Sequence, residues 1–486
     1  MNTSEPSQSV CPQCGKPVQA NYTERDGSIF FDINCPGCGV TSTLLSESRE
    51  DFDFWMEFEP VTAAPRVPIT EGSADSECPL HCGVCENHLM TACCVLLDVT
   101  ERCNQRCPYC FAKSEPDGRR SPESDPPLRT IERWYDRLLE LGEIRPFNIQ
   151  LSGGEPTVRD DLPEIINMGR DKGFEYIQLN TNGRHLAADI DYCVKLKEAG
   201  LSTVFLQFDG TDDSIYMALR GEPLLQIKKE AIENCAEAGL PVTLVPTITG
   251  GVNLSNIGSM INFMLENLHV VKGIHFQPVS LFGRYPESHS RAAGHQSGQA
   301  AEGSRKRTFT TIDRSPRVTM FSVMCEIENQ TGGLIKYEDL RPITTGHPLC
   351  CFCGSFLREP QGQIKSLMSD KTRGNGASCC CETAPDPLEI IRRDRDFVLN
   401  KWKVGPRDGK AGPDTARITR GDGSSGAISF DDAINYFRSN QFTVSGMAFM
   451  DKSNLDAERL RRCRVQVFTK DEKLIPFCAY NSLFRV

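Results

Sequence analysis

Short apolar runs alternate with longer amphipathic segments through the middle of the chain. Six runs rich in β-branched and aromatic residues are typical of buried strands, and they occupy residues 94–99, 147–152, 176–180, 203–208, 242–247 and 273–278. The segments between them place apolar residues at helical spacing, over residues 128–141, 163–172, 190–199, 224–238 and 257–268. Strands that alternate with helices in this way predict an α/β fold with a parallel sheet.

Polar residues and glycines follow these runs where each predicted strand ends. They occupy residues 103–110, 153–157, 180–182 and 207–209, with Thr247 and Gln277 at the last two strands. The carboxyl ends of parallel strands meet at one edge, and in parallel α/β barrels this edge holds the chemistry. We therefore expect the active site there.

Three cysteines follow the first predicted strand. Cys103, Cys107 and Cys110 have the spacing C-x3-C-x2-C. Three thiolates on one loop can bind three irons of a [4Fe–4S] cube and leave the fourth iron without a protein ligand. A zinc knuckle is the alternative, but zinc sites pair two Cys-x-x-Cys units, and three cysteines alone would leave the ion under-ligated. The spacing therefore favours an iron–sulfur cluster.

A second motif ends the next predicted strand at Gly153, Gly154 and Glu155, where glycine lets the backbone approach a ligand closely. Together with the cysteine loop it resembles the hallmarks of the radical S-adenosylmethionine (SAM) superfamily. The resemblance implies a partial (β/α)6 barrel, a [4Fe–4S] cluster on the cysteine loop, and SAM bound through its amino group by residues 153–155. It also implies an enzyme that cleaves SAM reductively to a 5′-deoxyadenosyl radical, with a low-potential electron donor of the flavodoxin or ferredoxin type.

Further SAM ligands are expected among the polar residues at the other strand ends. Arg220 is a candidate partner of the SAM carboxylate, because a guanidinium fits a carboxylate bidentately; the alternative is a solvated charge at a helix edge. Gln277 lies where the last strand of the family flanks adenine. The remaining candidates, for the ribose and the carboxylate, are Asn180, Asn182, Gln207 and Asp209.

Two C-x-x-C-G knuckles near the N-terminus predict a second metal site. Their cysteines, Cys11, Cys14, Cys35 and Cys38, complete a tetrahedral set of four sulfurs that suits Zn or a single rubredoxin-like iron. A structural ribbon and a one-electron relay both remain open, because the ligands are the same.

A third cysteine group, Cys78, Cys82 and Cys85, repeats the C-x3-C-x2-C spacing without a preceding strand and is followed by His88. We assign it to an auxiliary Fe–S cluster or a second metal that needs a further ligand. The best candidates are Cys350, Cys353 and Cys478, with Cys463 possible. The run at residues 379–381 has poor chelating geometry, and Cys193, Cys235 and Cys325 are expected to be buried thiols.

Composition limits the remaining function classes. The net charge of −11 argues against a nucleic-acid partner bound through a general basic surface. The 23 cysteines, with no basic and apolar signal region at the start, predict metal sites in a reducing, cytoplasmic setting. No apolar run approaches the length of a membrane span, which leaves at most peripheral membrane contact.

The expected organisation has five parts: a four-cysteine ribbon (1–48), a linker with the auxiliary cysteine motif (49–92), the barrel (93–285), a flexible insertion (286–320) and a C-terminal region with auxiliary cluster ligands (321–486). A second polar stretch covers residues 405–426. With His347-Pro-Leu-Cys350 and Phe477-Cys-Ala-Tyr480, this layout resembles the archaeal tetraether lipid synthase group, also described as dihydropterin methyltransferases.

That resemblance implies carbon–carbon bond formation between lipid alkyl chains, with auxiliary Fe–S clusters nearby. The two polar stretches and the run at residues 379–381 depart from the group and leave the substrate, lipid or small molecule, open. The alternatives are a radical SAM methyltransferase acting on a pterin-like small molecule, a peptide-modifying maturase, and a non-enzyme whose cysteines hold only structural zinc.

Overall fold

The computed structural model describes residues 6–485, apart from residues 59, 65–77, 81–82, 86, 113, 117–123, 143–146, 287–316, 344 and 368–435. Most of the expected insertion at 286–320, the whole polar stretch at 405–426, Cys82 and the cysteines at 379–381 lie outside the described residues.

A parallel sheet forms the centre of the molecule and contains the six expected strands. In spatial order they are β5 (Cys94–Thr100), β8 (Asn148–Gly153), β9 (Ile177–Thr181), β10 (Thr203–Gln207), β11 (Val242–Val245) and β13 (Val271–Pro278), and each pairs in parallel with the next. A short strand, β12 (Thr247–Ile248), resumes the β11 run after Pro246 and also pairs with β13. The α/β barrel prediction is confirmed.

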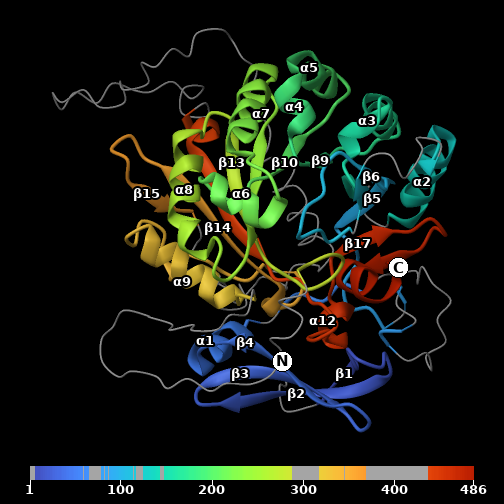
Figure 1. The fold of residues 1–486 in the computed structure, drawn as a ribbon, viewed down its shortest axis with the longest axis vertical. Helices are drawn as coiled ribbons and strands as arrows, with labels where there is room; N and C mark the ends of the chain where they lie inside the picture. The colour runs from blue at the N-terminus through green and yellow to red at the C-terminus, as the bar shows by residue number, and fades with distance from the viewer. Residues whose placement is uncertain are drawn as a thin grey trace, which may run out of the picture.

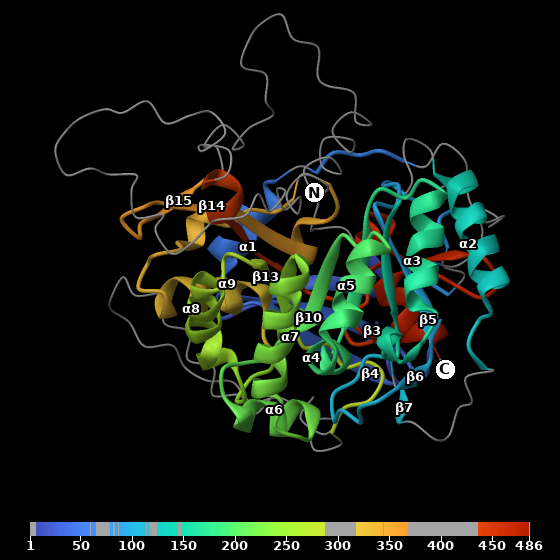
Figure 2. The same cartoon turned by 90° about the horizontal axis from the view of Figure 1, so that it is seen from above.

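Helices cover the outer face of this sheet, as Figures 1 and 2 show. They are α2 (Leu128–Leu141), α3 (Leu162–Asp171), α4 (Arg184–Ala188), α5 (Ile190–Glu198), α6 (Asp213–Arg220), α7 (Leu225–Ala238) and α8 (Ile257–Glu266). Alternate strand residues such as Val204 and Leu206 are fully buried against helix residues such as Leu196 and Ile232. The intervening residues, such as Phe205 and Gln207, are only partly buried and line the inner face.

The C-terminal region extends the barrel sheet at both edges, which the sequence did not predict. The strand β16 (Gln441–Met447) pairs in parallel with β13, and β17 (Val465–Phe468) pairs in parallel with β5. Beyond them lie antiparallel β14 (Cys351–Arg358) with β15 (Ile364–Ser366) on one side, and β18 (Leu474–Pro476) on the other. Figure 1 shows β17, in red, beside the N-terminal half of the barrel.

The chain ends in two short helical elements that follow β18. They are α13 (Phe477–Ala479) and the π-helical turn η8 (Tyr480–Phe484). Leu96 of β5 packs in one small apolar cluster with Phe477 and with Phe282, which lies after β13. The C-terminal segment therefore lies against the first strand of the barrel.

The N-terminal segment folds into an antiparallel sheet, blue in Figure 1, on the other side of the molecule from helices α2 to α8. Its strands are β1 (Ser7–Val10), β2 (Pro17–Arg25), β3 (Ser28–Cys35) and β4 (Gly39–Ser46), in that order. Asp26 and Gly27, with φ of 49° and 76°, form the β2–β3 turn, the backbone that a tight hairpin requires. Helix α1 (Arg49–Met56) follows, and Trp55 Nε1 donates a hydrogen bond to the carbonyl of Pro348 (2.7 Å).

Candidate active site and metal centres

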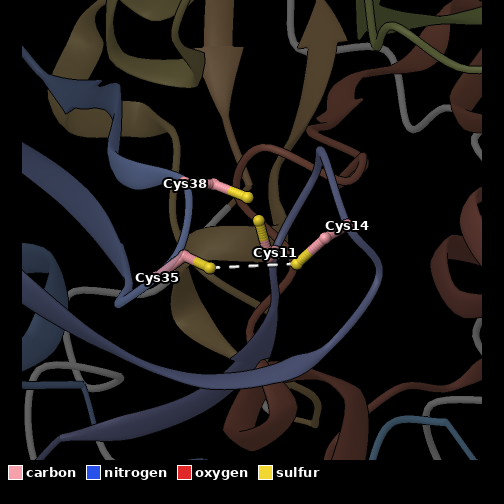
Figure 3. A group of neighbouring side chains, drawn as sticks. All are labelled: Cys11, Cys14, Cys35 and Cys38. Carbon is pink, nitrogen blue, oxygen red and sulfur yellow. Dashed lines mark hydrogen bonds between the residues drawn. The ribbon is translucent and has the colours of Figure 1, made fainter.

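The four N-terminal cysteines form a compact group at one end of the small sheet (Figure 3). Cys11 and Cys14 lie on the β1–β2 turn, whereas Cys35 ends β3 and Cys38 precedes β4. Their sulfurs all lie within 4.8 Å of one another, and Cys14 Sγ is 3.8 Å from Cys35 Sγ. A tetrahedral metal ion needs four sulfurs that converge in this way. The arrangement therefore fits the expected four-cysteine site.

The loop with Cys103, Cys107 and Cys110 leaves β5 at the carboxyl edge of the sheet. Cys103 is buried, and the other two thiols are half-buried. These three sulfurs do not converge within 4.8 Å as the N-terminal group does. A cubane cluster binds each cysteine through a different iron, so its ligands surround a volume instead of meeting at one point.

Basic side chains hold the backbone of this loop. Arg284 Nε donates to the carbonyl of Cys107 (2.9 Å), and the main chains of Arg284 and Cys110 exchange two hydrogen bonds of 2.9 Å each. Arg220 Nη1 donates to the carbonyl of Tyr109 (2.9 Å). The side-chain amide of Asn182 donates to Asn104 Oδ1 (2.7 Å). The cysteine loop is thus fixed without using its thiols.

Electrostatics differ between the two ends of the cysteine loop. Burial raises the pKa of Cys103 to about 12, and the nearby Glu155 carboxylate adds to the shift. Burial also raises the pKa of Cys107, but there Arg220 and Lys228 oppose the shift. Metal binding to either thiol must displace its proton, because the thiolate is the ligand. Negative charge is stabilised better at the Cys107 end.

The Gly-Gly-Glu loop packs directly on the start of the cysteine loop. A Cβ on Gly153 would lie 2.0 Å from the carbonyl oxygen of Thr100, and one on Gly154 would lie 2.0 Å from that of Arg102. The backbone N–H groups of Gly154 and Glu155 donate to these same oxygens, each at 2.8 Å. Glycine is required here so that two backbones can touch.

The Glu155 carboxylate is buried and accepts hydrogen bonds from neutral donors only. One oxygen accepts from the hydroxyls of Thr157 and Thr181, each at 2.7 Å, and the other accepts from the backbone N–H of Asn182 (2.7 Å). These bonds join the ends of β8 and β9. The expected role of residues 153–155 in binding SAM stays a prediction.

Asp209 and Arg220 form a bidentate ion pair that is almost fully buried. Arg220 Nε and Nη2 lie 2.7 and 2.8 Å from the two carboxylate oxygens, and Nη2 also donates to Thr247 Oγ1 (2.9 Å). The alternative of a solvated charge does not describe this side chain, which is 7% exposed. Its pairing with a SAM carboxylate stays a prediction.

Lys228 is a site residue that the sequence reading missed. Its side chain is fully buried, and its amine donates to the carbonyl of Asn182 (2.5 Å) and to Gln207 Oε1 (3.3 Å). Burial lowers its pKa to about 8, with Asp209 opposing the shift. Arg284 and Asn104 were missed as well. A lysine on an amphipathic helix gives no local signal of burial.

The inner face of the sheet is lined by buried and half-buried polar and aromatic side chains. Gln178 Nε2 donates to Asn180 Oδ1 (2.9 Å) on β9, and His275 Nδ1 lies 2.9 Å from Ser445 Oγ across the β13–β16 pair. Gln277 is half-buried on β13, and its backbone N–H donates to the carbonyl of Pro246 (2.9 Å). Several predicted SAM ligands therefore share one face.

An aromatic wall stands beside the cysteine loop, made by Phe111, Phe282, Phe449, Phe477 and Tyr480. Phe111 follows Cys110 directly, is 39% exposed, and has its ring centroid 5.8 Å from that of Phe477. Phe477 in turn contacts the rings of Phe449 (4.5 Å) and Phe282 (6.1 Å). The Arg485 guanidinium lies over Phe111 and Tyr480 and pairs with Asp98 of β5.

Three further cysteines, Cys350, Cys463 and Cys478, lie near helix α12 (Ala457–Arg461). Arg459 lies beside Cys350 (Nη2 to Sγ 3.6 Å), and the Cys463 and Cys478 thiols are close enough to Cys350 for their charges to interact. Cys353 instead lies on β14, in register with Ser445. The structure thus groups Cys350 and Cys478, two of the three favoured candidates, with Cys463, which was the further possibility.

The Cys78 thiol lies close enough to Arg461 of α12 and to Cys85 for their charges to interact. The ring nitrogens of His88 are both buried, and neither has a hydrogen-bond partner among the described residues. Burial lowers the pKa of His88 to about 4. An auxiliary site in this region stays a prediction.

Comparisons with known proteins decide the family. Residues 97–264 match the family model of the radical SAM superfamily, and residues 4–47 match that of the HMPTM N-terminal zinc ribbon domain. A Methanocaldococcus jannaschii protein named 7,8-dihydro-6-hydroxymethylpterin dimethyltransferase is 33% identical over 98% of this chain and 93% of its own length. The chain belongs to the radical SAM superfamily. It is an enzyme of that superfamily with an N-terminal zinc-ribbon-like module.

Other proteins match only part of the chain. A probable GTP 3′,8-cyclase of Methanothermobacter thermautotrophicus is 34% identical over 35% of this chain and 53% of its own. Among solved structures, Streptococcus suis SuiB has a TM-score of 0.32 at 17% identity, covering 39% of this chain and 40% of its own. The maturase HydG of Carboxydothermus hydrogenoformans has a TM-score of 0.36 at 12% identity, covering 50% and 52%. No helix in the described part of this radical SAM enzyme could cross a membrane.

Proposed function

We propose that this enzyme uses SAM-derived 5′-deoxyadenosyl radicals to form carbon–carbon bonds at unactivated sp3 carbons, with alkyl chains of lipids as the substrate class. Cys103, Cys107 and Cys110 would hold a [4Fe–4S] cluster, and when bound that cluster would supply the electron for SAM cleavage, drawn from an external low-potential donor. The arrangement of the thiols supports this cofactor. All three lie on one loop, and Arg220 and Arg284 hold that loop by hydrogen bonds to its backbone carbonyls.

The protein's own contribution is to bind, orient and exclude water. The backbone contacts of residues 153–155 with residues 100–102 fix the cysteine loop against the neighbouring strand end. The half-buried polar side chains of the inner face, among them Asn180, Gln207 and Gln277, offer amide groups for the adenosine part of SAM. Asp209 and Arg220 tie the ends of β10 and β12 to the loop.

The aromatic wall carries the substrate part of the proposal. Phe111, whose ring is exposed, directly follows Cys110 in the sequence, and its ring contacts Phe477 at the edge of the buried aromatic rings. The phenyl rings of this surface can bury methylene groups, each worth about 0.8 kcal/mol, and they carry no hydrogen-bonding group for a polar ring. Alkyl carbon laid along this wall would sit next to the site of radical formation.

Two observations favour methyl transfer to a pterin-like small molecule as a second candidate. The relative that matches nearly the whole chain carries that name. The inner face also presents Gln178, Asn180, His275 and Ser445, which suit a polar heterocycle.

Product stoichiometry separates the two candidates. Coupling two C–H carbons removes two hydrogen atoms, so each new bond consumes two SAM and two electrons and releases two deoxyadenosine and two methionine. Methyl transfer instead releases S-adenosylhomocysteine with each methylated product. Anaerobically reconstituted protein should be given SAM, dithionite and either lipid extracts or a reduced pterin, and all products followed by mass spectrometry.

Controls test the radical step itself. Cys107→Ala should abolish deoxyadenosine formation, whereas Cys193→Ala, which alters a buried thiol on α5, should retain it. Coupled chains at two deoxyadenosine per bond support the first candidate. Methylated pterin with S-adenosylhomocysteine, and no coupled chains, would replace it with the second.

The auxiliary cysteines form the last part of the proposal. We infer a further Fe–S cluster or metal site near α12, with ligands drawn from Cys78, Cys85, Cys350, Cys463 and Cys478. The buried His88, with neither ring nitrogen satisfied among the described residues, supports a missing partner in this region. Iron and sulfide well above one cube per chain, reduced in Cys78→Ala, would support this site; one cube per chain would refute it.

A further inference from the structure

Lys228 is a buried cation whose hydrogen-bond acceptors are neutral. Its side chain lies on the first turn of α7 and is fully buried. Its amine donates to the backbone carbonyl of Asn182 (2.5 Å) and to Gln207 Oε1 (3.3 Å). In the part of the chain that the structure describes, no carboxylate oxygen comes within 4.0 Å of it. An isolated buried ammonium is costly, so a group of negative charge is expected nearby.

The carboxylates of this region are engaged elsewhere. Asp209 is held bidentately by Arg220, and Glu155 is saturated by Thr157, Thr181 and the backbone of Asn182. Both interact with Lys228 only at longer range. Neither is therefore the direct partner that a buried ammonium needs.

Two hydrogen bonds through Asn182 connect Lys228 to the cysteine loop. Asn182, which accepts from Lys228 through its carbonyl, donates through its side-chain amide to Asn104 (2.7 Å), the residue after Cys103. Arg220 and Arg284 contact the same loop through the carbonyls of Tyr109 and Cys107. Lys228 is thus connected to the loop through Asn182, while two arginines contact the loop directly, and the thiols of this loop become anionic when they bind metal.

We propose that Lys228 is a positioning residue whose positive charge stabilises the reduced, more negative state of the cluster bound by Cys103, Cys107 and Cys110. This inference rests on the proposed function, since it requires that cluster. Fixed charge near a cluster is one of the means by which a protein sets its reduction potential. A cation that raises this potential makes the cluster easier to reduce by an external donor.

The test is a redox titration of the SAM-free, reconstituted enzyme, followed by electron paramagnetic resonance. Lys228→Met should lower the midpoint potential of the cluster by about 59 mV. For a one-electron couple, this shift lowers the ratio of reduced to oxidised cluster at a fixed solution potential about tenfold. Lys229→Met is the matched control, because Lys229 is the next residue on α7 and is exposed. Lys228→Arg, which keeps the charge, should restore much of the potential.

Other outcomes overturn the proposal. An unchanged midpoint in Lys228→Met with weaker SAM binding would assign Lys228 to the SAM carboxylate instead. An unchanged midpoint with unchanged SAM binding would leave no electrostatic role. If neither Lys228→Met nor Lys228→Gln assembles a cluster that the wild type assembles, Lys228 serves folding. A wild type that assembles no cluster would instead refute the proposed function.

Discussion

Gly154→Ala tests the backbone contact between the Gly-Gly-Glu loop and the cysteine loop. The added Cβ would lie 2.0 Å from the carbonyl oxygen of Arg102 and 2.9 Å from that of Glu101, whereas real Cβ atoms essentially never come within 3.0 Å of such atoms. The two segments must therefore separate by about 1 Å, a strain worth about 1–3 kcal/mol. Cys103 directly follows Arg102, so this movement displaces the first of the three predicted cluster ligands.

The same movement weakens two hydrogen bonds, from the N–H groups of Gly154 and Glu155, each worth about 1 kcal/mol net. We expect the free energy of unfolding to fall by about 3–5 kcal/mol in total. A ligand misplaced by about 1 Å can lower a rate about 100-fold, so deoxyadenosine formation should fall by about that factor.

The assay combines a denaturant midpoint, iron content after reconstitution and the rate of deoxyadenosine formation. Lys229→Ala is the control, because it changes an exposed side chain on α7 without adding a backbone contact, and its effect should stay within about 0.5 kcal/mol. Wild-type values of all three quantities in Gly154→Ala would refute the reasoning from backbone contact.

Three further predictions test other parts of the molecule. Cys35→Ser should lower bound metal by one ion per chain and make the N-terminal sheet sensitive to proteolysis; an unchanged metal content would exclude the four-cysteine site. Asp209→Asn should destabilise the protein by about 3–5 kcal/mol by leaving Arg220 buried and unpaired, whereas the exposed Asp191→Asn should not, as denaturant melts would show. Burial lowers the pKa of Lys272 to about 8 from 10.5, so the unfolded chain binds more protons between these values and stability should rise with pH across that window. Lys272→Met should flatten this rise by up to about 3 kcal/mol, and an identical pH profile in the variant would contradict the assignment.

The barrel strands could be predicted because each is buried on its helix-facing side. Parallel strands of this kind leave short, nearly continuous apolar runs in the sequence. The expected strand at 203–208 corresponds to β10, Thr203–Gln207, and that at 273–278 to β13, Val271–Pro278. The run at 242–247 is split at Pro246, which has no backbone N–H for the ladder.

The N-terminal cysteine group could be predicted for a different reason. Ligands on one turn or loop are close in sequence, so their spacing records their geometry. The sequence gives no such signal for Lys228. Lys229 is the same residue type in the same helix, yet Lys228 is buried and Lys229 is exposed. Only the packing of α7 on the strand ends distinguishes them.

The C-terminal strands show that features the sequence could not predict also matter for function. β16 and β17 join the sheet at opposite edges, and the seven- and four-residue runs that form them carry no mark of which strand they will pair with. Yet β16 places Ser445 beside His275, and β17 leads through β18 to Phe477 in the aromatic wall. Local motifs therefore predict the superfamily's shared chemistry, whereas the surfaces proposed to select the substrate arise from long-range pairing. For this reason the sequence could indicate radical formation but left open whether the substrate is a lipid or a pterin. Variants of Phe111 and Phe477 should impair activity on a lipid substrate, whereas variants of His275 and Ser445 should impair activity on a pterin.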